Sequence, residues 1–332
     1  MPVLEVKNLA VTFQTYAGTI YAVNGISFTA EKNETLVIVG ESGCGKTAAA
    51  NAIVRLLPGK KTKICAGSEI IFEGKNILEY TETEMEKLRG DKIAMIFQDP
   101  LSYLNPTMTV GKQIMESLLI HKKGSKKEAL EKTLRILEMA QIQNPEKRLK
   151  QYPHEFSGGM RQRVMIAMAL VCSPEILIAD EPTTALDVTI QAEILELIKQ
   201  LQNATKTAVI LITHDLGIAA EIADKIQVMY AGEIVERGKK ADIFKNARHP
   251  YTAALLAAVP SVHCLKKDKL YALEGSHPDM LEKPAACPFA PRCAHCMKIC
   301  LERKPPETQA GKDHFTSCWL EHRFAKTGKR NE

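Results

Sequence analysis

Eight consecutive residues near the amino terminus have the composition and spacing of a phosphate-binding loop. They follow the apolar run Thr35–Val39, precede a helical stretch, and are Gly40, Glu41, Ser42, Gly43, Cys44, Gly45, Lys46 and Thr47. In such a loop the glycines let backbone N–H groups surround nucleotide phosphates, and the start of the helix adds positive potential. We predict that Lys46 neutralises the β- and γ-phosphates and that Thr47 ligates Mg²⁺.

Two carboxylates end a second apolar run, residues 176–179. Asp180 is expected to hold Mg²⁺ directly or through water. Glu181 is expected to lie beside the γ-phosphate and to act as the general base for an attacking water. Acidic residues at a strand end are often only solvated, but the phosphate-binding loop in the same chain favours the catalytic interpretation.

Ser157, Gly158 and Gly159 open another helix and form a second potential anion site, because the amino terminus of a helix presents unpaired N–H groups. One chain rarely needs two such sites for one nucleotide. We therefore expect this turn to contact the nucleotide bound by a partner chain. The alternative is an ordinary helix cap made by Ser157.

Short strands and amphipathic helices alternate around these residues. Residues 3–13, 19–29 and 68–72 alternate in polarity, which predicts strands. Shorter apolar runs suit strands buried on both faces; they are Thr35–Val39, 92–97, 176–179, Ala208–Thr213 and Lys225–Tyr230. Helices such as 189–203 separate several of these runs, as crossovers between parallel strands require. The pattern predicts an α/β fold with a helical insertion within about residues 105–170.

The composition excludes several classes of protein. The chain has 332 residues, of which 45% are hydrophobic and 25% charged, as expected for a globular protein of about two domains. Its net charge of +5 does not indicate the dense basic face typical of nucleic-acid binding, so we expect no nucleic-acid partner. No apolar run reaches the roughly 18 residues that span a bilayer. We expect a soluble, intracellular protein that can dock on a membrane partner.

The motifs occur in an order that is typical of a known family. The phosphate-binding loop is followed by Phe-Ser-Gly-Gly-Met at residues 156–160 and by Leu-Ile-Ala-Asp-Glu-Pro at 177–182. On these motifs the sequence resembles the ATP-binding subunits of ABC transporters. The resemblance implies a P-loop NTPase (RecA-like) core with an amino-terminal antiparallel β subdomain, the inserted helical subdomain and a small Cys-rich extension. It implies an ATPase domain at residues 1–248, the extension at 249–325 and a basic tail at 326–332.

The resemblance also implies roles for single residues. Gln98 matches the glutamine that contacts Mg²⁺, the attacking water and the membrane subunit, and His214 matches the histidine that contacts the γ-phosphate. Tyr16 lies nearest the position whose aromatic ring stacks on adenine, although Phe13 and Tyr21 compete for that role.

Two subunits of such a protein are expected to enclose two ATP molecules. In each site one chain is expected to supply Lys46, Thr47, Gln98, Asp180, Glu181 and His214. The other chain is expected to supply Ser157, Gly158, Gly159 and Asp187 in trans. The implied partners are a second ATPase subunit, two membrane permease subunits and an extracytoplasmic substrate-binding protein. The implied location is peripheral, on the cytoplasmic face of the cell (inner) membrane. A soluble ABC ATPase acting on nucleic acid or the ribosome is the rival interpretation, but the sequence has neither a long coiled coil nor a second set of motifs.

Segments 249–260 and 287–293 resemble one branch of the family, the dipeptide and oligopeptide importer ATPases, which also includes nickel-import ATPases. Peptides are therefore the expected solute and nickel is the alternative. In this branch the extension holds a [4Fe–4S] cluster, and the matching residues are Cys287, Cys293, Cys300 and Cys318. Two features depart from the family: Ala286 replaces a usual glycine, and Cys296 is an additional thiol. Zinc bound by Cys293, Cys296, Cys300 and Cys318 is an alternative, and reduced cysteines without metal are another.

Overall fold

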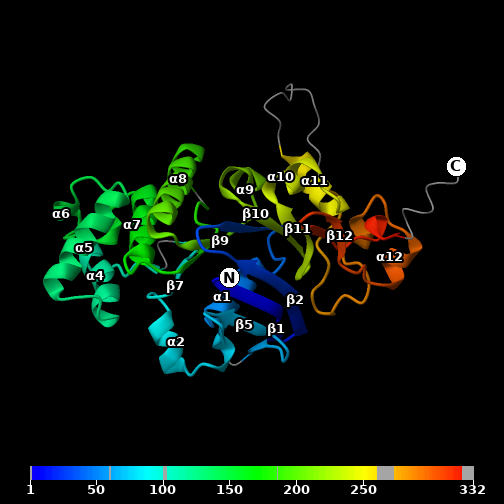
Figure 1. Cartoon of the computed structure of the whole chain (residues 1–332), viewed down its shortest axis with the longest axis horizontal. Coiled ribbons are helices and arrows are strands. Elements are labelled where there is room, and N and C mark those ends of the chain that lie inside the picture. Colours follow the sequence, from blue (N-terminus) through cyan, green and yellow to red (C-terminus); the bar gives the residue numbers. More distant parts are fainter. Residues whose placement is uncertain (1, 60, 100–102, 185, 260–272, 324–332) are drawn as a thin grey trace. The chain divides into compact units, whose positions relative to one another are not determined.

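The computed structural model describes residues 2–59, 61–99, 103–184, 186–259 and 273–323 (Figure 1). Its internal contacts divide the chain into two units, each built from three segments. The first unit comprises residues 1–4, 29–35 and 71–212, and the second comprises residues 5–28, 36–70 and 213–332.

The first unit contains a parallel sheet whose strands are buried throughout or nearly so. In this sheet β8 (Ile176–Asp180) lies between β7 (Ile93–Ile96) and β9 (Ala208–Thr213) and pairs with both in parallel. The long helix α8 (Val188–Thr205) buries Ile194, Leu197, Ile198 and Leu201, which recur at helical spacing. The apolar runs of the sequence therefore become strands covered on both faces, as expected for parallel sheets.

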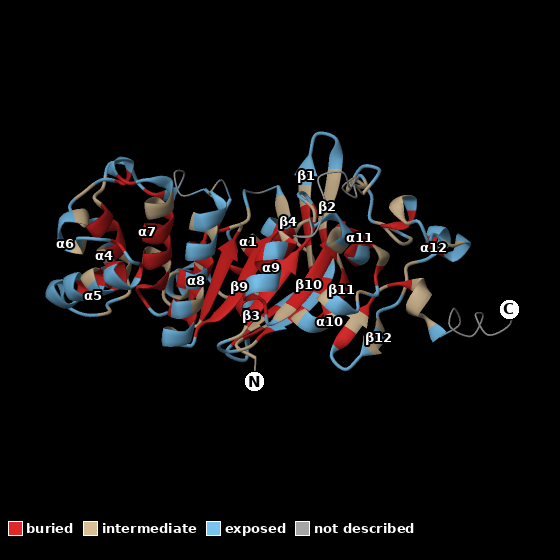
Figure 2. Cartoon of the chain, turned by 90° about the horizontal axis from the view of Figure 1, so that it is seen from above, coloured by how far each residue is buried: buried red, intermediate tan, exposed pale blue. Residues whose placement is uncertain are grey.

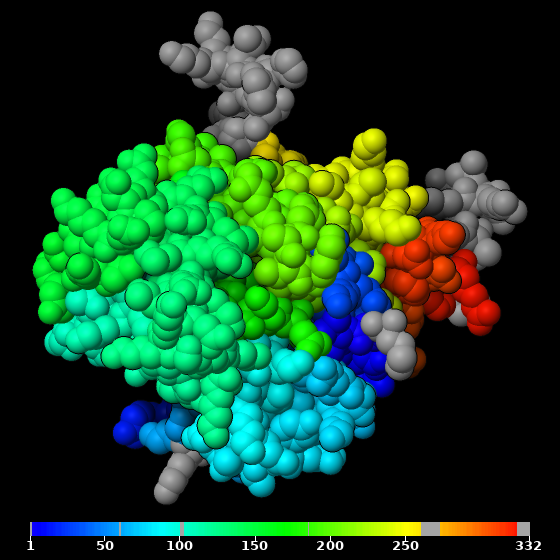
Figure 3. Space-filling view, turned by 60° about the vertical axis from the view of Figure 1, so that its left-hand side comes forward, coloured from blue at the N-terminus to red at the C-terminus, as the bar shows by residue number. Residues whose placement is uncertain are grey.

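Four helices of the first unit form the helical insertion that the sequence predicts. They are α4 (Val110–Ile120), α5 (Lys126–Met139), α6 (Pro145–Arg148) and α7 (Gly158–Leu170). Figure 3 shows them, in green, as one continuous packed surface. Helix α5 begins at a capping box, in which Ser125 and Glu128 each accept a hydrogen bond from the other's backbone N–H. The shorter elements of this unit are β6 (Lys75–Asn76), η1 (Ile77–Glu79), α2 (Glu82–Leu88) and η2 (Pro153–Glu155).

The second unit contains its own run of paired strands (Figure 2). Strand β3 (Thr35–Val39) pairs in parallel with β10 (Lys225–Tyr230), and β10 pairs antiparallel with β11 (Glu233–Lys239). Two short strands from the end of the chain continue the sheet: β13 (His314–Thr316) pairs with β11, and β12 (Thr308–Gly311) pairs with β13. Sequence reasoning did not predict β11, β12 or β13.

The amino-terminal strands form an antiparallel sheet, as predicted. Strand β1 (Leu4–Thr15) has β2 (Gly18–Ala30) beside it and pairs antiparallel with β4 (Thr62–Ile64), with Val11 opposite Ile64. Strand β5 (Glu69–Phe72) pairs antiparallel with β6. The alternating burial of β1 and β5 explains the polar and apolar alternation of their sequences.

The helices of the second unit connect its strands and carry the carboxy-terminal extension. They are α1 (Lys46–Ile53), α9 (Leu216–Ile222), α10 (Lys240–Lys245), α11 (Pro250–Ala258), α12 (Lys298–Glu302), η3 (Ala290–Arg292) and η4 (Trp319–Glu321). Phe289 of the extension packs against Tyr230 of β10 and Tyr251 of α11, with ring centroids 5.3 and 5.4 Å away. These three rings are buried and attach the extension to the strands beneath it.

Within the described ranges, no helix combines the length and the apolar character that crossing a bilayer requires.

Candidate functional site

The phosphate-binding loop of residues 40–47 connects β3 to α1 in the second unit. Two of its glycines lie against backbone carbonyls: a Cβ on Gly40 would come within 2.1 Å of the Met229 oxygen, and one on Gly45 within 2.1 Å of the Ala22 oxygen. Gly45 also has a φ of +105°, which disfavours a side chain. Neighbouring backbone therefore requires glycine at both positions.

Lys46 lies inside the loop rather than in solvent. It is 5% exposed, and its Nζ donates to the carbonyl oxygens of Gly40 at 2.7 Å and Glu41 at 2.9 Å. The ammonium group is thus held at the start of α1, where the helix dipole and the first N–H groups already favour an anion. Cys44 Sγ lies 3.8 Å from Lys46 Nζ, and burial raises the pKa of the Cys44 thiol.

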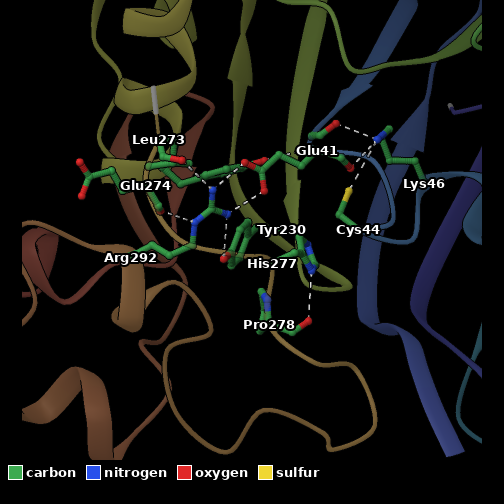
Figure 4. A network of polar contacts seen from close by, with 11 residues as sticks. Glu41, Cys44, Lys46, Tyr230, Leu273, Glu274, His277, Pro278 and Arg292 are labelled. Carbon is green, nitrogen blue, oxygen red and sulfur yellow. Dashed lines mark hydrogen bonds and ion pairs between the residues drawn. The ribbon is translucent and has the colours of Figure 1, made fainter. Parts of the chain in front are cut away.

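Three groups from outside the loop fix its backbone and its one carboxylate. Arg292 binds the Glu41 carboxylate through two hydrogen bonds, at 2.7 Å (Nη1 to Oε2) and 3.0 Å (Nη2 to Oε1) (Figure 4). The Glu41 backbone N–H donates to the Tyr251 hydroxyl at 3.0 Å, and the Gly232 N–H donates to the Cys44 carbonyl at 2.9 Å. Hydrogen bonding to Glu41 raises the pKa of Arg292, and burial raises that of Tyr251.

Sequence reasoning missed Arg292 and Tyr251. Both lie more than 200 positions from Glu41, and no local spacing connects them to the loop. The only sequence signal was indirect: Arg292 lies within the Cys-rich segment.

His214 and Tyr16 also belong to the second unit. His214 follows β9 immediately before α9, whose first turn is capped by Asp215 accepting from the Gly217 N–H at 2.6 Å. Tyr16 stands at the turn between β1 and β2 with its ring fully exposed, and the Lys61 ammonium lies 4.9 Å from the ring centroid. The ring therefore makes a cation–π contact at the surface.

In the first unit the structure brings Gln98 and Glu181 together. Gln98 Nε2 donates to Glu181 Oε2 at 3.1 Å, and Thr184 Oγ1 donates to the same oxygen at 2.9 Å. Glu181 has a φ of +45°, which is uncommon for a residue with a side chain, and its N–H donates to Ile212 at 2.9 Å. Asp180 ends β8 and is 3% exposed. Sequence reasoning missed Thr184, although it lies only three residues beyond Glu181.

The Ser-Gly-Gly turn opens α7 in the same unit. Ser157 Oγ accepts from the Met160 N–H at 3.4 Å, so Ser157 caps the helix. A Cβ on Gly159 would lie 2.8 Å from Ile190 Cγ2, so glycine lets α7 approach α8 closely. A Cβ on Gly158 would meet only Leu186 Cδ2, at 3.9 Å. Packing within the chain therefore accounts for glycine at residue 159 but not at residue 158.

Asp187 caps α8, because its Oδ1 accepts from the Ile190 N–H at 3.0 Å. The next residue, Val188, is 82% exposed.

The four cysteines expected to hold a cluster lie within electrostatic reach of one another in the extension. Burial, together with the neighbouring cysteines, raises the pKa of Cys287 to about 11 and that of Cys318 to about 12. The Cys287 N–H donates to the Cys300 carbonyl at 3.0 Å, and the Met297 N–H donates to Cys300 Sγ at 3.5 Å. The additional thiol, Cys296, is exposed.

Across the residues that the structure describes, no three His, Cys, Asp or Glu side chains converge closely enough to hold a metal ion. The structure thus shows neither the predicted cluster site nor the zinc alternative as a formed metal group. The ligand set remains a prediction.

Comparison with known proteins matches two family models to the chain. The model described as ABC transporter matches residues 23–184, and the model described as oligopeptide/dipeptide transporter, C-terminal region, matches residues 235–300.

Two curated relatives match the chain over almost its whole length. The dipeptide transport ATP-binding protein DppD of Bacillus subtilis is 52% identical, covering 98% of this chain and 96% of the relative. The oligopeptide transport ATP-binding protein OppD of Salmonella typhimurium is 51% identical, covering 92% of this chain and 90% of the relative.

Solved structures give the same result for the fold. A dimeric ATP-binding cassette in a post-hydrolysis state, bound to ADP and phosphate, superposes with a TM-score of 0.63 at 30% identity, covering 71% of this chain and 98% of that one. A component of an ABC transporter complex from Clostridium perfringens superposes with the same TM-score at 27% identity, covering 74% of this chain and 91% of that one.

Proposed function

The chain belongs to the ABC transporter family as an ATP-binding subunit of its dipeptide and oligopeptide branch, and on that premise we propose that it hydrolyses ATP to drive peptide uptake. The observation that carries the proposal is the similarity to peptide-transport ATP-binding proteins over almost the whole chain, extension included. A relative acting on nucleic acid or the ribosome would not be expected to share that extension.

The phosphate-binding loop is proposed to bind the ATP phosphates. Lys46 donates to the β- and γ-phosphate oxygens, and the N–H groups of residues 40–47 surround them. Thr47, Gln98 and Asp180 are the proposed Mg²⁺ ligands, since hydroxyl, amide and carboxylate oxygens are the donors that this ion prefers. The bound ion neutralises phosphate charge.

Glu181 is proposed to be the general base. It accepts a proton from water as the water oxygen attacks the γ-phosphorus in line, and the bond to the β-phosphate oxygen breaks to give ADP and phosphate. The hydrogen bonds from Gln98 and Thr184 to Glu181 Oε2 orient the carboxylate. His214 is proposed to contact the γ-phosphate, and Tyr16 to stack on adenine.

A second ATPase subunit, identical or different, is proposed to complete each site through Ser157, Gly158, Gly159 and Asp187. Room for a Cβ at Gly158 supports this proposal, because packing within the chain does not require glycine there. Two N–H groups at the start of α7 then face the partner's nucleotide.

The remaining partners are proposed to be two permease subunits, which place the protein on the cytoplasmic face of the inner membrane, and a substrate-binding protein acting through them. Next to Gln98, the ring of Phe97 stacks on that of Tyr103 at 3.9 Å, and Tyr103 is 51% exposed. Half-exposed aromatic rings are enriched where proteins dock. We further propose an ATPase domain at residues 1–248, an extension at 249–325 and a tail at 326–332.

The solute can be tested by transport in a strain from which the gene has been deleted. We expect the wild-type gene to restore uptake of radiolabelled di- and tripeptides and a Glu181→Gln variant to leave uptake at the level of the deletion. Glu196→Gln, the same substitution at an exposed residue of α8, serves as the control and restores uptake. Restored uptake of ⁶³Ni²⁺ without peptide uptake would replace the peptide assignment with nickel.

We propose that Cys287, Cys293, Cys300 and Cys318 hold a [4Fe–4S] cluster. Their donor set fits chemically, since thiolates are the usual ligands of such clusters, and Cys287, Cys293 and Cys300 each raise the pKa of Cys318. When bound, the cluster cross-links a segment with little regular structure. The raised pKa of Cys287 and of Cys318 means that ligation by these two thiols must displace protons.

Iron and sulfide analysis of anaerobically purified protein tests the cluster. We expect about four irons and four sulfides per chain with a broad visible absorption band, and loss of both in Cys300→Ser. Cys65→Ser, which removes a thiol from outside the extension, should keep the full iron content. About one zinc per chain would support the alternative ligand set, and a metal-free protein would contradict both proposals.

A further inference from the structure

A residue of the Cys-rich extension, Arg292, pairs with the carboxylate of the phosphate-binding loop. Glu41 is the one carboxylate among residues 40–47, and it stands beside the place proposed for a triphosphate. Its only described ion-pair partner is Arg292, whose side chain is 6% exposed. Two parallel hydrogen bonds make this the geometry in which a guanidinium holds a carboxylate most firmly.

Two further hydrogen bonds fix the guanidinium group of Arg292. Its Nε donates to the Glu274 carbonyl at 3.0 Å and its Nη1 to the Tyr230 hydroxyl at 3.3 Å. Figure 4 shows the guanidinium pointing from the extension toward Glu41. The Tyr251 hydroxyl accepts from the Glu41 N–H, so the backbone and the side chain of the same residue are both held. The Glu41 carboxylate therefore has little freedom to rotate away from Arg292.

We propose that Arg292 is a positioning residue for ATP: it neutralises Glu41 and holds it away from the phosphates, so that the extension sets the affinity of the phosphate-binding loop. Without Arg292, a carboxylate is left uncompensated next to a polyanion, and like charges at short range repel. The inference rests on the proposed binding of ATP at residues 40–47.

The position of Arg292 links the affinity for ATP to the proposed cluster ligands Cys287 and Cys293. Arg292 ends η3, and η3 lies between two of the proposed ligands: the Ala290 N–H donates to the Cys287 carbonyl at 3.1 Å, and the Cys293 N–H donates to the Ala290 carbonyl at 3.3 Å. A metal group that binds Cys287 and Cys293 would therefore also fix the backbone of η3, from which Arg292 reaches Glu41.

The test is a charge-rescue series on the full-length chain. Binding of N-methylanthraniloyl-ATP is followed by fluorescence without Mg²⁺, which prevents hydrolysis. We expect Arg292→Gln to raise the Kd about tenfold at low salt, and the defect to shrink as salt screens Glu41. The double variant Glu41→Gln/Arg292→Gln should recover most of the lost affinity. Arg292→Lys, which keeps the charge but not the paired geometry, should fall between Arg292→Gln and the wild type.

Arg237 provides the matched control. It makes a paired contact of the same kind with Glu307, at 2.7 and 2.8 Å, in the same unit, and Arg237→Gln should leave the Kd unchanged. An unchanged Kd in Arg292→Gln, or a double variant no better than Arg292→Gln alone, overturns the inference while ATP binding stands. A wild-type Kd no tighter than that of Lys46→Ala overturns the proposed function and the inference with it.

Discussion

Replacing Glu181 by glutamine should lower ATP hydrolysis about a hundredfold or more and leave ATP binding intact, because general-base catalysis contributes 10²–10⁴-fold in rate. The amide keeps the size of the side chain and still accepts the hydrogen bonds of Gln98 and Thr184. It cannot take the proton of the attacking water. The measurement is phosphate release at saturating ATP, paired with a nucleotide-binding titration.

The control for this prediction is Glu196→Gln, which removes the charge of an exposed glutamate on α8 and should hydrolyse ATP at the wild-type rate. Both variants are assayed with the partner ATPase present, since one intact site of a pair could otherwise mask the loss. A Glu181→Gln enzyme with near wild-type turnover would remove Glu181 from the role of base.

Replacing Lys46 by alanine should weaken ATP binding by about two orders of magnitude, because truncating one partner of a hydrogen-bonded charge pair costs 2–5 kcal/mol. The same ammonium group donates to two loop carbonyls, Gly40 and Glu41. The variant therefore loses both the charge for the phosphates and two contacts that shape the loop. A binding titration with ATP gives the Kd directly.

Thermal unfolding of Lys46→Ala separates loss of binding from loss of the fold. Lys63→Ala, at an exposed position of β4 in the same unit, should match the wild type in both measurements. ATP affinity that survives in a folded Lys46→Ala protein would exclude the loop of residues 40–47 as the nucleotide site.

The sequence predicted the parts of the fold whose signals are local. Strands β3, β9 and β10 begin and end at the predicted residues, because each is a short, mostly apolar run bounded by polar or turn residues. The predicted α/β cassette fold with its antiparallel sheet is confirmed by the structure and by its likeness to solved cassettes. A loop motif of fixed spacing identified residues 40–47 in the same way.

Contacts between distant segments could not be predicted in this way. Strand β13 has three residues, too few for alternation to show, and it exists because β11 offers it a partner. The pairing of Arg292 with Glu41 depends on the same tertiary arrangement. Thr184 was missed for another reason: its role depends on the left-handed backbone at Glu181, and sequence spacing carries no sign of that conformation.

The carboxy-terminal strands limit where this chain can be truncated without exposing an edge of the sheet. Strand β13 shields the hydrogen-bonding edge of β11, and His314 on β13 contacts the fully buried Glu236 carboxylate at 2.7 Å. A truncated version ending before β12 would leave an open, adhesive edge and an acid in the interior without its histidine. The extension thus protects the edge of the sheet. We expect its removal to destabilise the remaining strands and to let them pair with strands of another molecule.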